Sequence, residues 1–440
     1  MKKLSFIDYN NNYHLQRTRI IMSSPTVALS LLLLLSTQLL ADETKKSTLS
    51  QEYLHSPREA IDNVTKLGQK KVSGVDNLKH MFSDAKVNGQ IKSIYAGYNY
   101  KKETLQDIYA TAIGGMLKYE LASLHGFNAA VSVYTAHDIN FLTGENGHIN
   151  HELSSENGYY TEMAEAYFNY TYKDLNLRVG RQVLNTPLAD SDDVRVIQNS
   201  FDAYVATYHL NDIELMVGNI QRWQGFDAGL EDFWSKTGTD GTNFIGLIYS
   251  DMTELDIWYY NITGITNAFY IDGGFNYPFS KDITLHAMVQ YLQEEELKSS
   301  GVESTIYGTL VECIIYDIGL NISYNRALQK LDKKSFAGFG GGTLFTSMDT
   351  ITLDLLAQDE NAQAIATGLT YNYKKFQFLY AYGDFSSDSK HIAEQDITAQ
   401  YNINDEFLVA TIYSIESDLK QQQKTDDDWN RLQILINYNF

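Results

Sequence analysis

The feature that most constrains this chain is an alternation of apolar and polar residues with a period of two. It is clearest in the last ten residues, RLQILINYNF, where Leu432, Ile434, Ile436 and Tyr438 fall on one side and mostly polar residues, beginning with Arg431, fall on the other. This alternation is typical of a β-strand with one apolar and one polar face. A strand of a soluble sandwich reads in the same way, so the recurrence of the pattern along the chain is the deciding observation.

The alternation recurs in eighteen segments, most of them long enough to cross a membrane as tilted strands of roughly 9–11 residues. An even number of strands is what a closed antiparallel barrel of a bacterial outer membrane requires. The expected strands are 88–100, 107–120, 127–138, 161–172, 175–183, 199–210, 212–223, 242–250, 254–262, 266–277, 282–294, 303–315, 317–328, 361–373, 376–385, 391–402, 405–416 and 428–440.

The connections between these segments alternate in length. Every second connection is very short and contains turn residues, as in Asn211-Asp212 and Tyr316-Asp317, whereas the intervening ones are often long and polar: 139–160, 184–198, 224–241, 329–360 and 417–427. A sandwich has no reason to sort its loops in this way, but a membrane barrel has short periplasmic turns and long extracellular loops. The sequence therefore predicts an all-β fold, a transmembrane antiparallel β-barrel of about 18 strands over residues 86–440.

The prolines and the single cysteine agree with this prediction. Pro187 is expected in a loop and Pro278 in a turn, while Pro25 and Pro57 precede the strands, so no proline removes a hydrogen bond from the sheet. Cys313 cannot form an internal disulfide and excludes any cysteine-built zinc or iron–sulfur site. No cofactor is expected.

The N-terminal region has the pattern of an export signal. The 14-residue apolar run 27–40 follows four basic residues and suits a signal peptide better than an uncleaved membrane anchor. We therefore expect a signal peptide at 1–41 and a periplasmic extension at 42–85, a lead-in segment rather than a plug. Removing 1–41 takes four of the 34 basic residues and one of the 55 acidic ones and leaves a net charge of −24. Nucleic-acid binding is excluded, because proteins with that function are usually basic.

Residues 165–210 contain four short motifs in this order: Gly180-Arg181-Gln182, Thr186-Pro187, Asp193-Val194-Arg195 and Asn199-Ser200-Phe201. This series resembles the core of OprD-type outer-membrane porins. In that family a strand ending in Gly-Arg-Gln leads to a Thr-Pro pair, then to Asp-x-Arg and to an Asn/Thr-x-Phe strand start. The lead-in 84–100 and the terminal NYNF are similar to members found in the Campylobacterota, although the family usually has Pro where Gln198 stands. The resemblance implies a passive diffusion channel for small polar solutes, narrowed by inward-folded loops and lined on one wall by arginines.

Strand parity and this resemblance together suggest pore-lining residues. Arg178 alternates with Leu177 and Val179, so it is expected to face the lumen, because a charge facing the bilayer midplane costs roughly 2–4 kcal/mol. Arg222 shares the polar parity of its segment, whereas Arg181 falls on the apolar parity and is assigned to the pore by the resemblance alone.

Arg195 lies in the loop that the family folds into the pore. We expect Arg181, Arg195 and Arg222 to contribute to a cationic wall whose field orients dipolar solutes. The alternative for each is an ordinary solvated charge. The carboxylates expected to face this wall are Asp190, Asp192 and Asp193.

Other candidate sites have weaker signals. The glycine-rich run 336–349 lacks the Lys-Ser/Thr of a phosphate-binding loop and is expected to be a flexible external loop or a second inward-folded constriction. The acidic run 426–428 permits weak Ca²⁺ binding but is more commonly a solvated loop, and no metal site is predicted. No nucleophile motif accompanies His125, His209 or His286, so no enzymatic activity is expected.

These observations favour a porin in the outer membrane of a Gram-negative bacterium. The alternative is a non-conducting structural or adhesin barrel, which would need loops to close a lumen too wide for side chains alone to fill. The expected partners are outer-membrane lipid, small hydrophilic solutes and the barrel-assembly machinery, which would recognise the terminal Phe440. The chain is expected to be a monomer or a homotrimer.

Overall fold

The computed structural model describes residues 73–145, 147–192, 195–229, 234–251, 253–336 and 338–440. The predicted signal peptide, most of the predicted extension and Asp193 lie outside the described residues. In the part of the chain that the structure describes, no helix combines the length and the apolar character needed to cross a membrane.

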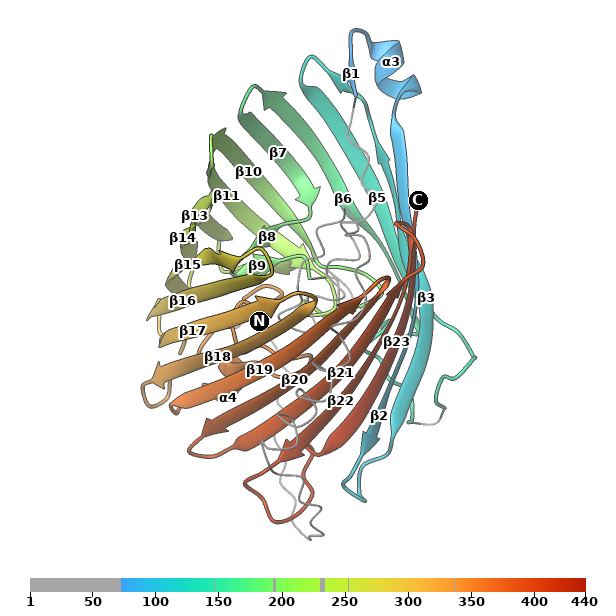
Figure 1. Cartoon of the computed structure of the whole chain (residues 1–440). Coiled ribbons are helices and arrows are strands. Elements are labelled where there is room, and N and C mark those ends of the chain that lie inside the picture. The colour runs from blue at the N-terminus through green and yellow to red at the C-terminus, as the bar shows by residue number, and fades with distance from the viewer. Residues whose placement is uncertain (1–72, 146, 193–194, 230–233, 252, 337) are drawn as a thin grey trace.

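The described chain forms one sheet of long antiparallel strands that closes on itself (Figure 1). Its first long strand, β2, pairs with its last, β23, from Gln90 opposite Asn439 to Tyr100 opposite Trp429. The long strands are β2 (Lys86–Tyr100), β3 (Ile108–Glu120), β5 (Phe127–Asp138), β6 (Tyr159–Tyr172), β7 (Leu175–Gln182), β10 (Ser200–Leu210), β11 (Ile213–Gln224), β13 (Thr242–Ser250), β14 (Thr253–Ile262), β15 (Thr266–Ser280), β16 (Ile283–Glu296), β17 (Ser304–Ile315), β18 (Ile318–Gln329), β19 (Ala362–Tyr373), β20 (Phe376–Ser387), β21 (His391–Asn402), β22 (Phe407–Asp418) and β23 (Trp429–Asn439).

Short elements occupy the connections and the N-terminal end. They are β1 (Gly74–Val75), α3 (Leu78–Ser83), β4 (Ser123–Leu124), β8 (Asn185–Thr186), β9 (Ala189–Asp190), β12 (Ser235–Lys236) and α4 (Leu353–Leu356). β1 pairs in parallel with β4, so the described end of the predicted extension lies beside the connection between β3 and β5. The role of that extension stays a prediction.

The predicted eighteen-strand antiparallel barrel is confirmed. Each expected segment overlaps one long strand, and the ends differ by at most three residues. Pro278 is the exception to the predicted proline positions, because it lies within β15 near its end. The pairing of β15 with β16 shifts register between Pro278 and Ser280, and a bulge at a strand end tolerates the missing N–H.

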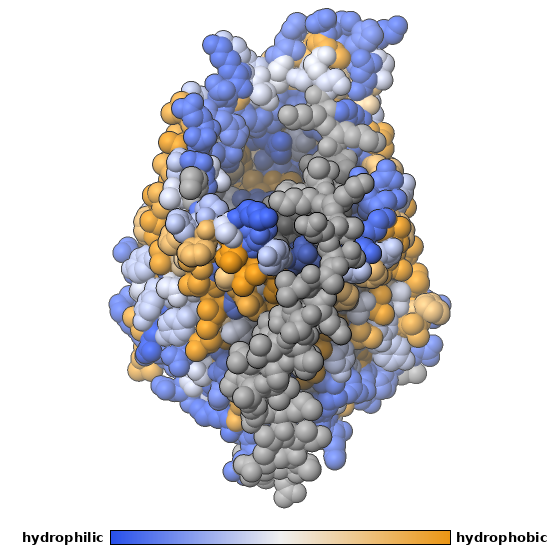
Figure 2. Space-filling view, in the orientation of Figure 1, coloured by the Kyte–Doolittle hydropathy of each residue, from blue (hydrophilic) through white to orange (hydrophobic). Residues whose placement is uncertain are grey.

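Successive side chains alternate between the outer and inner faces of the wall. In the middle of β16, Val289 is 61% exposed on the outside, whereas Gln290 is 3% exposed and donates a hydrogen bond to a loop inside the barrel. Figure 2 shows apolar residues along both flanks of the molecule and more polar residues toward its two ends. The period of two in the sequence therefore separates an apolar outer face from a polar inner one.

The two-residue turns between the long strands are all at one end of the barrel, whereas the shortest connections at the other end, 263–265 and 388–390, have three residues. In four of these turns one non-glycine residue adopts the left-handed region, which closes a tight hairpin between twisted strands. These residues are Lys173, Asn211, Tyr316 and Lys374, with φ between 52° and 57°. The long connections therefore gather at the opposite end, from which they can fold inward.

Candidate functional site

The loop after β18, residues 330–361, folds into the barrel. Gln290 on the inner face of β16 donates to the carbonyl of Thr343 at 2.7 Å. On a distant part of the ring, Glu394 of β21 accepts a hydrogen bond from the N–H of Thr350 at 3.0 Å. Contacts with such widely separated strands are possible only from the inside. The described part of the glycine-rich run 336–349 is therefore inside the barrel, which agrees with the second of its two predicted alternatives.

The loop between β7 and β10, residues 183–199, also turns inward and pairs with the first loop. The N–H of Asp190 donates to the carbonyl of Phe339 at 2.9 Å, and the N–H of Phe339 donates to the carbonyl of Leu188 at 3.0 Å. The backbones approach closely next to Gly340, where φ is +81° and a Cβ would lie 2.2 Å from the carbonyl oxygen of Asp190. Leu188 and Phe339 are buried in the apolar cluster between these loops and the wall.

A buried arginine on the last strand connects two inward loops to the wall. Arg431 of β23 is 1% exposed, and its Nη2 donates to Oε1 of Glu152 at 3.0 Å. Its Nη1 donates to Oδ2 of Asp349 at 2.7 Å. Glu152 belongs to the loop 139–158 and Asp349 to the loop 330–361, so a single guanidinium joins both loops through charge-assisted hydrogen bonds.

Two further cations lie in the same network. Nη2 of Arg195 is 3.7 Å from Oε2 of Glu152, and its Cζ lies 4.9 Å from the ring centre of Phe226. Lys92, buried in β2, donates from Nζ to the backbone carbonyl of Arg195 at 3.1 Å. The loop 183–199 thus joins the loops 139–158 and 330–361 at one place on the inner wall.

The Glu152 carboxyl in this network has a strongly lowered pKa. Burial alone would raise the pKa of the Glu152 carboxyl, but Arg431 and Arg195 outweigh burial and lower this pKa to about 2. A hydrogen bond from Arg431 acts in the same direction. Glu152 is therefore a carboxylate at neutral pH, and its attraction to the two arginines is fully developed.

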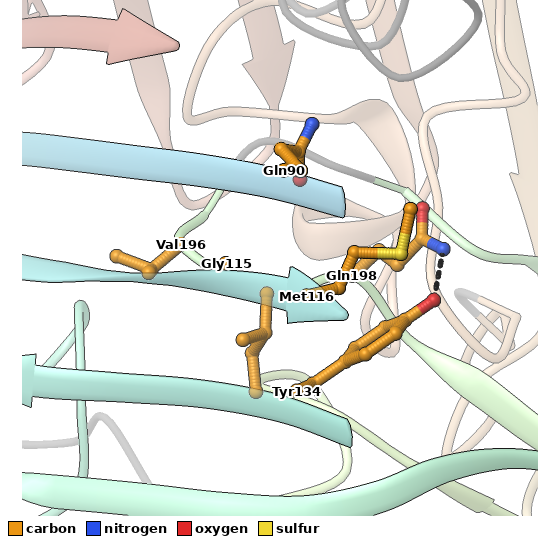
Figure 3. Close-up of a pocket in the computed structure, with 7 residues that line it drawn as sticks. Gln90, Gly115, Met116, Tyr134, Val196 and Gln198 are labelled. Carbon is orange, nitrogen blue, oxygen red and sulfur yellow. Dashed lines mark hydrogen bonds between the residues drawn. The ribbon is translucent and has the colours of Figure 1, made fainter. Parts of the chain in front are cut away.

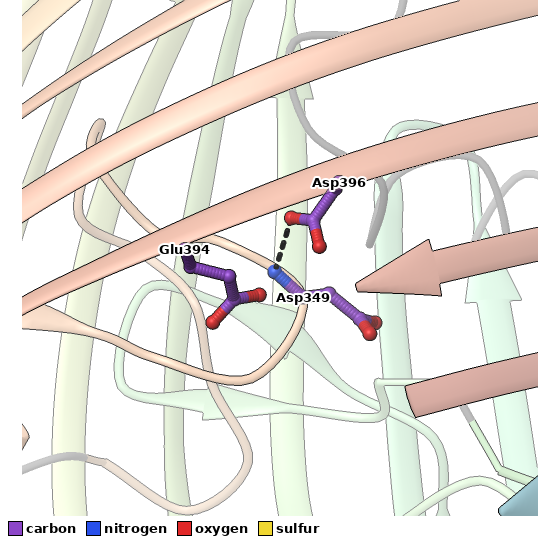
Figure 4. Close-up of side chains that lie close together, drawn as sticks. All are labelled: Asp349, Glu394 and Asp396. Carbon is purple, nitrogen blue, oxygen red and sulfur yellow. Dashed lines mark hydrogen bonds between the residues drawn. The ribbon is translucent and has the colours of Figure 1, made fainter. Parts of the chain in front are cut away.

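Three carboxylates lie together next to the loop 330–361 (Figure 4). Ligand oxygens of Asp349, Glu394 and Asp396 lie within 4.8 Å of one another. Hard oxygen atoms in such a group suit a cation such as Ca²⁺. The two acids on β21 bond to the loop, because Glu394 accepts from the N–H of Ile351 at 3.1 Å and Asp396 accepts from the N–H of Asp349 at 3.3 Å. The group therefore anchors the loop to β21.

A small pocket lies between the wall and the loop 183–199 (Figure 3). Nε2 of Gln198 donates to the hydroxyl of Tyr134, on β5, at 2.6 Å. Gln198 stands where the resembled family usually has Pro, so this departure gives the loop an additional hydrogen bond to the wall. The pocket is lined by Gln90, Gly115, Met116, Tyr134, Val196, Ile197 and Gln198.

Arg178 faces the lumen, in agreement with its strand parity. It lies directly opposite Asn169 of β6, and its Nε donates to Oδ1 of that residue at 3.2 Å. Its Cζ lies 4.5 Å from the ring centre of Tyr167, which is buried on the same inner face. A solute contact at Arg178 stays a prediction.

Arg222 is not on the inner face that its parity predicted. The pairing of β10 with β11 shifts register between Asp202 and Ala203 and leaves Gln221 as an extra residue. This bulge turns Arg222 to the outer face, where its Nη2 is 2.8 Å from Oδ2 of Asp202. Parity arguments hold only along regular strands, and a bulge reverses them.

Arg181 lies on the outer parity of β7, as its alternation with Gly180 predicted, and it lies directly opposite Asp202. Its Nη1 is 2.9 Å from Oε1 of Glu162, and its Cζ lies 4.5 Å from the ring centre of Trp234. A pore-lining role for Arg181 stays a prediction from the resemblance, and the register does not favour it.

The aspartates predicted to face the arginines lie in the loop 183–199. Asp190 is half-buried in β9 and Asp192 is buried two residues later. Both therefore lie with the loop inside the barrel, while Asp193 is outside the described residues. Their part in solute passage stays a prediction.

Four residues of the ion network were not among those predicted to line the pore: Arg431, Lys92, Glu152 and Asp349. A signal existed for Arg431, because it shares the polar parity of β23 with Gln433, and both are buried on the inner face. No local signal marks the two acidic residues, because they lie in loops.

Solved structures with this architecture include a porin and an outer-membrane protein. A BenF-like porin from Pseudomonas fluorescens Pf-5 matches with a TM-score of 0.69 and 14% identity, covering 82% of this chain and 99% of that chain. OccAB3 of Acinetobacter baumannii matches with a TM-score of 0.68 and 14% identity, covering 82% of this chain and 100% of that chain. OpdK of Pseudomonas aeruginosa, determined with vanillate, matches with a TM-score of 0.68 and 15% identity, covering 82% of this chain and 99% of that chain.

At the level of sequence, no family model and no curated protein matches the chain. The similarity to members from the Campylobacterota stays a prediction, since the structures named above come from Pseudomonas and Acinetobacter. The three-dimensional matches confirm the resemblance at the level of architecture: the chain has the barrel fold of the OprD-type outer-membrane porins.

Proposed function

We propose that this protein is a porin of the outer membrane of a Gram-negative bacterium, a passive channel for small polar or charged solutes. The observation that carries this proposal is a closed barrel with an apolar outer face and an ion network that joins three long loops at one place on its inner wall. A transmembrane barrel needs the first property, and a selective channel needs the second.

The outer face supports insertion into lipid. Val217 on β11 and Ile245 on β13 lie directly opposite each other and are more than half exposed. In water such rows would leave a large apolar surface uncovered, whereas in a bilayer they contact acyl chains. A ring of eighteen strands also encloses more space than inward side chains fill.

The inner charges support selection by an electric field. Arg431, Arg195 and Lys92 form a cationic group on β23, β2 and the adjoining loop. The carboxylates of Glu152 and Asp349 face these cations from the loops 139–158 and 330–361. A polar solute passing these groups would be oriented by the field between them. Arg178 would extend the cationic lining along β7, and Asp190 and Asp192 would contribute negative charge from the loop.

Planar-bilayer recording tests the channel and its lining. Purified protein should give discrete current steps, and Arg195→Gln should shift the permeability ratio toward cations. Arg326→Gln is the matched control. Within the described residues, the Arg326 side chain makes one hydrogen bond, from Nη1 to Oε1 of the neutral Gln363 at 3.4 Å. A permeability ratio that is the same in Arg195→Gln and in wild type would contradict the cationic lining while leaving the channel proposal intact.

Liposome swelling identifies the solute class. The panel contains amino acids, sugars and carboxylates, and it includes vanillate because OpdK was determined with that compound. A porin should admit at least one class faster than protein-free liposomes do. Equal rates for all solutes and for empty liposomes would argue against solute passage.

A non-conducting barrel is the second candidate, and one observation favours it. Leu188, Phe339 and Leu353 from the inward loops are buried together against the wall, which gives the lumen an apolar filling. Protein that inserts into bilayers but never passes current in any salt would select this alternative. Recognition of Phe440 by the assembly machinery and a monomeric or trimeric state are further expectations of the porin proposal.

A further inference from the structure

A row of asparagines marks the limit of the apolar outer wall on the side of the long loops. Asn219 donates from Nδ2 to Oδ1 of Asn243 at 2.8 Å, and Asn261 donates to Asn267 at 2.7 Å. Register places these four residues directly opposite one another across β11, β13, β14 and β15. Two residues nearer the tight turns, the same face is apolar, as at Val217. The row therefore lies where acyl chains give way to lipid headgroups.

A row of charges lies just beyond the asparagines, on the side of the long loops. Arg181, Asp202, Arg222 and Lys236 are directly opposite one another across β7, β10, β11 and β12. Arg222 follows Asn219 by three residues, a distance of at most about 10 Å along a strand. The row is thus at headgroup depth on the outer surface of the barrel.

This row has more positive than negative charge. Arg222, with a side chain 47% exposed, lies opposite the exposed Lys236, and like charges in directly opposite positions destabilise a sheet. Asp202 pairs with Arg222, and Glu162 pairs with Arg181. Within the described ranges, no carboxylate forms an ion pair with Lys236. An anion from outside the chain would relieve the repulsion.

We propose that Arg222 and Lys236, flanked by Arg181, bind the phosphate groups of an anionic lipid in the outer leaflet. The guanidinium fork of Arg222 matches two phosphate oxygens, and the ammonium of Lys236 supplies a point charge beside it. Because the site faces lipid, it is reached from the membrane and not from the pore. Arg181 and Arg222 face outward and so are not placed to line the pore, but they can take part in this lipid site.

The test measures binding of lipid A to the purified full-length protein in detergent by native mass spectrometry. Each basic residue near an anionic membrane surface contributes about a fivefold gain in binding, so Arg222→Gln/Lys236→Gln should bind lipid A roughly 30-fold more weakly. Lys236→Gln alone, in a two-residue strand, should bind about fivefold more weakly and serves if the double variant fails to fold. Lys281→Gln, exposed at a tight turn at the opposite end, is the matched control and should bind as the wild type does.

Further lipids distinguish the possible outcomes. Enzymatically dephosphorylated lipid A should bind weakly to the wild type, and inorganic phosphate should not compete at the concentrations that saturate lipid A. Equal binding of both lipid A forms, unchanged binding by the variants, or full competition by phosphate would overturn the lipid site. The inference rests on the proposed membrane location. Wild-type protein that binds neither lipid A nor phosphatidylcholine would contradict that location, whereas equal binding of both contradicts the lipid site alone.

Discussion

Arg431 contacts carboxylates from two different loops, and its removal leaves both Glu152 and Asp349 in a buried position without their shared cation. Breaking a buried ion pair from one side typically costs about 3–5 kcal/mol. We therefore expect Arg431→Met to lower the free energy of unfolding by about that amount, measured by urea denaturation in lipid vesicles. Arg326→Met, an arginine on the outer face opposite Gln363, should cost less than about 1 kcal/mol. Equal losses in the two variants would show that the network contributes little.

Glu152 gives the network a defined pH dependence. Its folded pKa of about 2 is below the ordinary 4.5, so its ionised form stabilises the folded state by roughly 3 kcal/mol. Because folding lowers this pKa, the stabilisation is complete above about pH 4.5 and is lost as the pH falls toward 2. The stability difference between wild type and Glu152→Gln should therefore be constant from pH 7 to 5 and shrink below pH 4.5. Thermal unfolding at each pH measures it, and Glu156→Gln, at an exposed position of the same loop, is the matched control.

At the scale of elements, the crossing of the two inward loops depends on a missing side chain. Gly340 has a φ of +81°, and a Cβ there would lie 2.2 Å from the backbone carbonyl of Asp190. Gly340→Ala should therefore separate the loops, raise single-channel conductance severalfold and reduce stability by about 1–3 kcal/mol. Gly301→Ala is the matched control, since Gly301 has a similar φ of +83° but its nearest contact is at 4.0 Å. If both variants change conductance equally, backbone strain and not the loop crossing is responsible.

The strands were predictable from the sequence because a wall between lipid and polar contents imposes its period on every residue. Val289 and Gln290 show this on one strand, where neighbours have opposite exposure. The same rule failed at Arg222, because the extra residue Gln221 reverses the faces and nothing in the local sequence marks a bulge. Pro278 was misplaced for a related reason, since it lies at a register shift and not in the turn.

At the scale of the whole molecule, ring closure explains why the ion network was not predictable. Arg431 and Glu152 are 279 positions apart in the sequence, and Arg431 and Asp349 are 82 apart. They meet because β23 returns to β2 and because long loops at one end fold back into the lumen. Strand patterns specify which way Arg431 faces, but the partners depend on the path of loops that have no periodic signal.

The orientation of the whole wall can be tested by placing a charge at its centre. Val289 lies in the middle of β16 on the outer face, so Val289→Arg should lower stability in phospholipid vesicles by about 2–4 kcal/mol. Phe279→Arg, exposed on β15 beside a tight turn, should cost about 0–1 kcal/mol, because water and headgroups reach that depth. Urea unfolding of the vesicle-inserted proteins measures both changes. Similar costs at the two positions would mean that Val289 does not face hydrocarbon, and the barrel would then have to sit in the membrane differently from the way its apolar outer rows indicate.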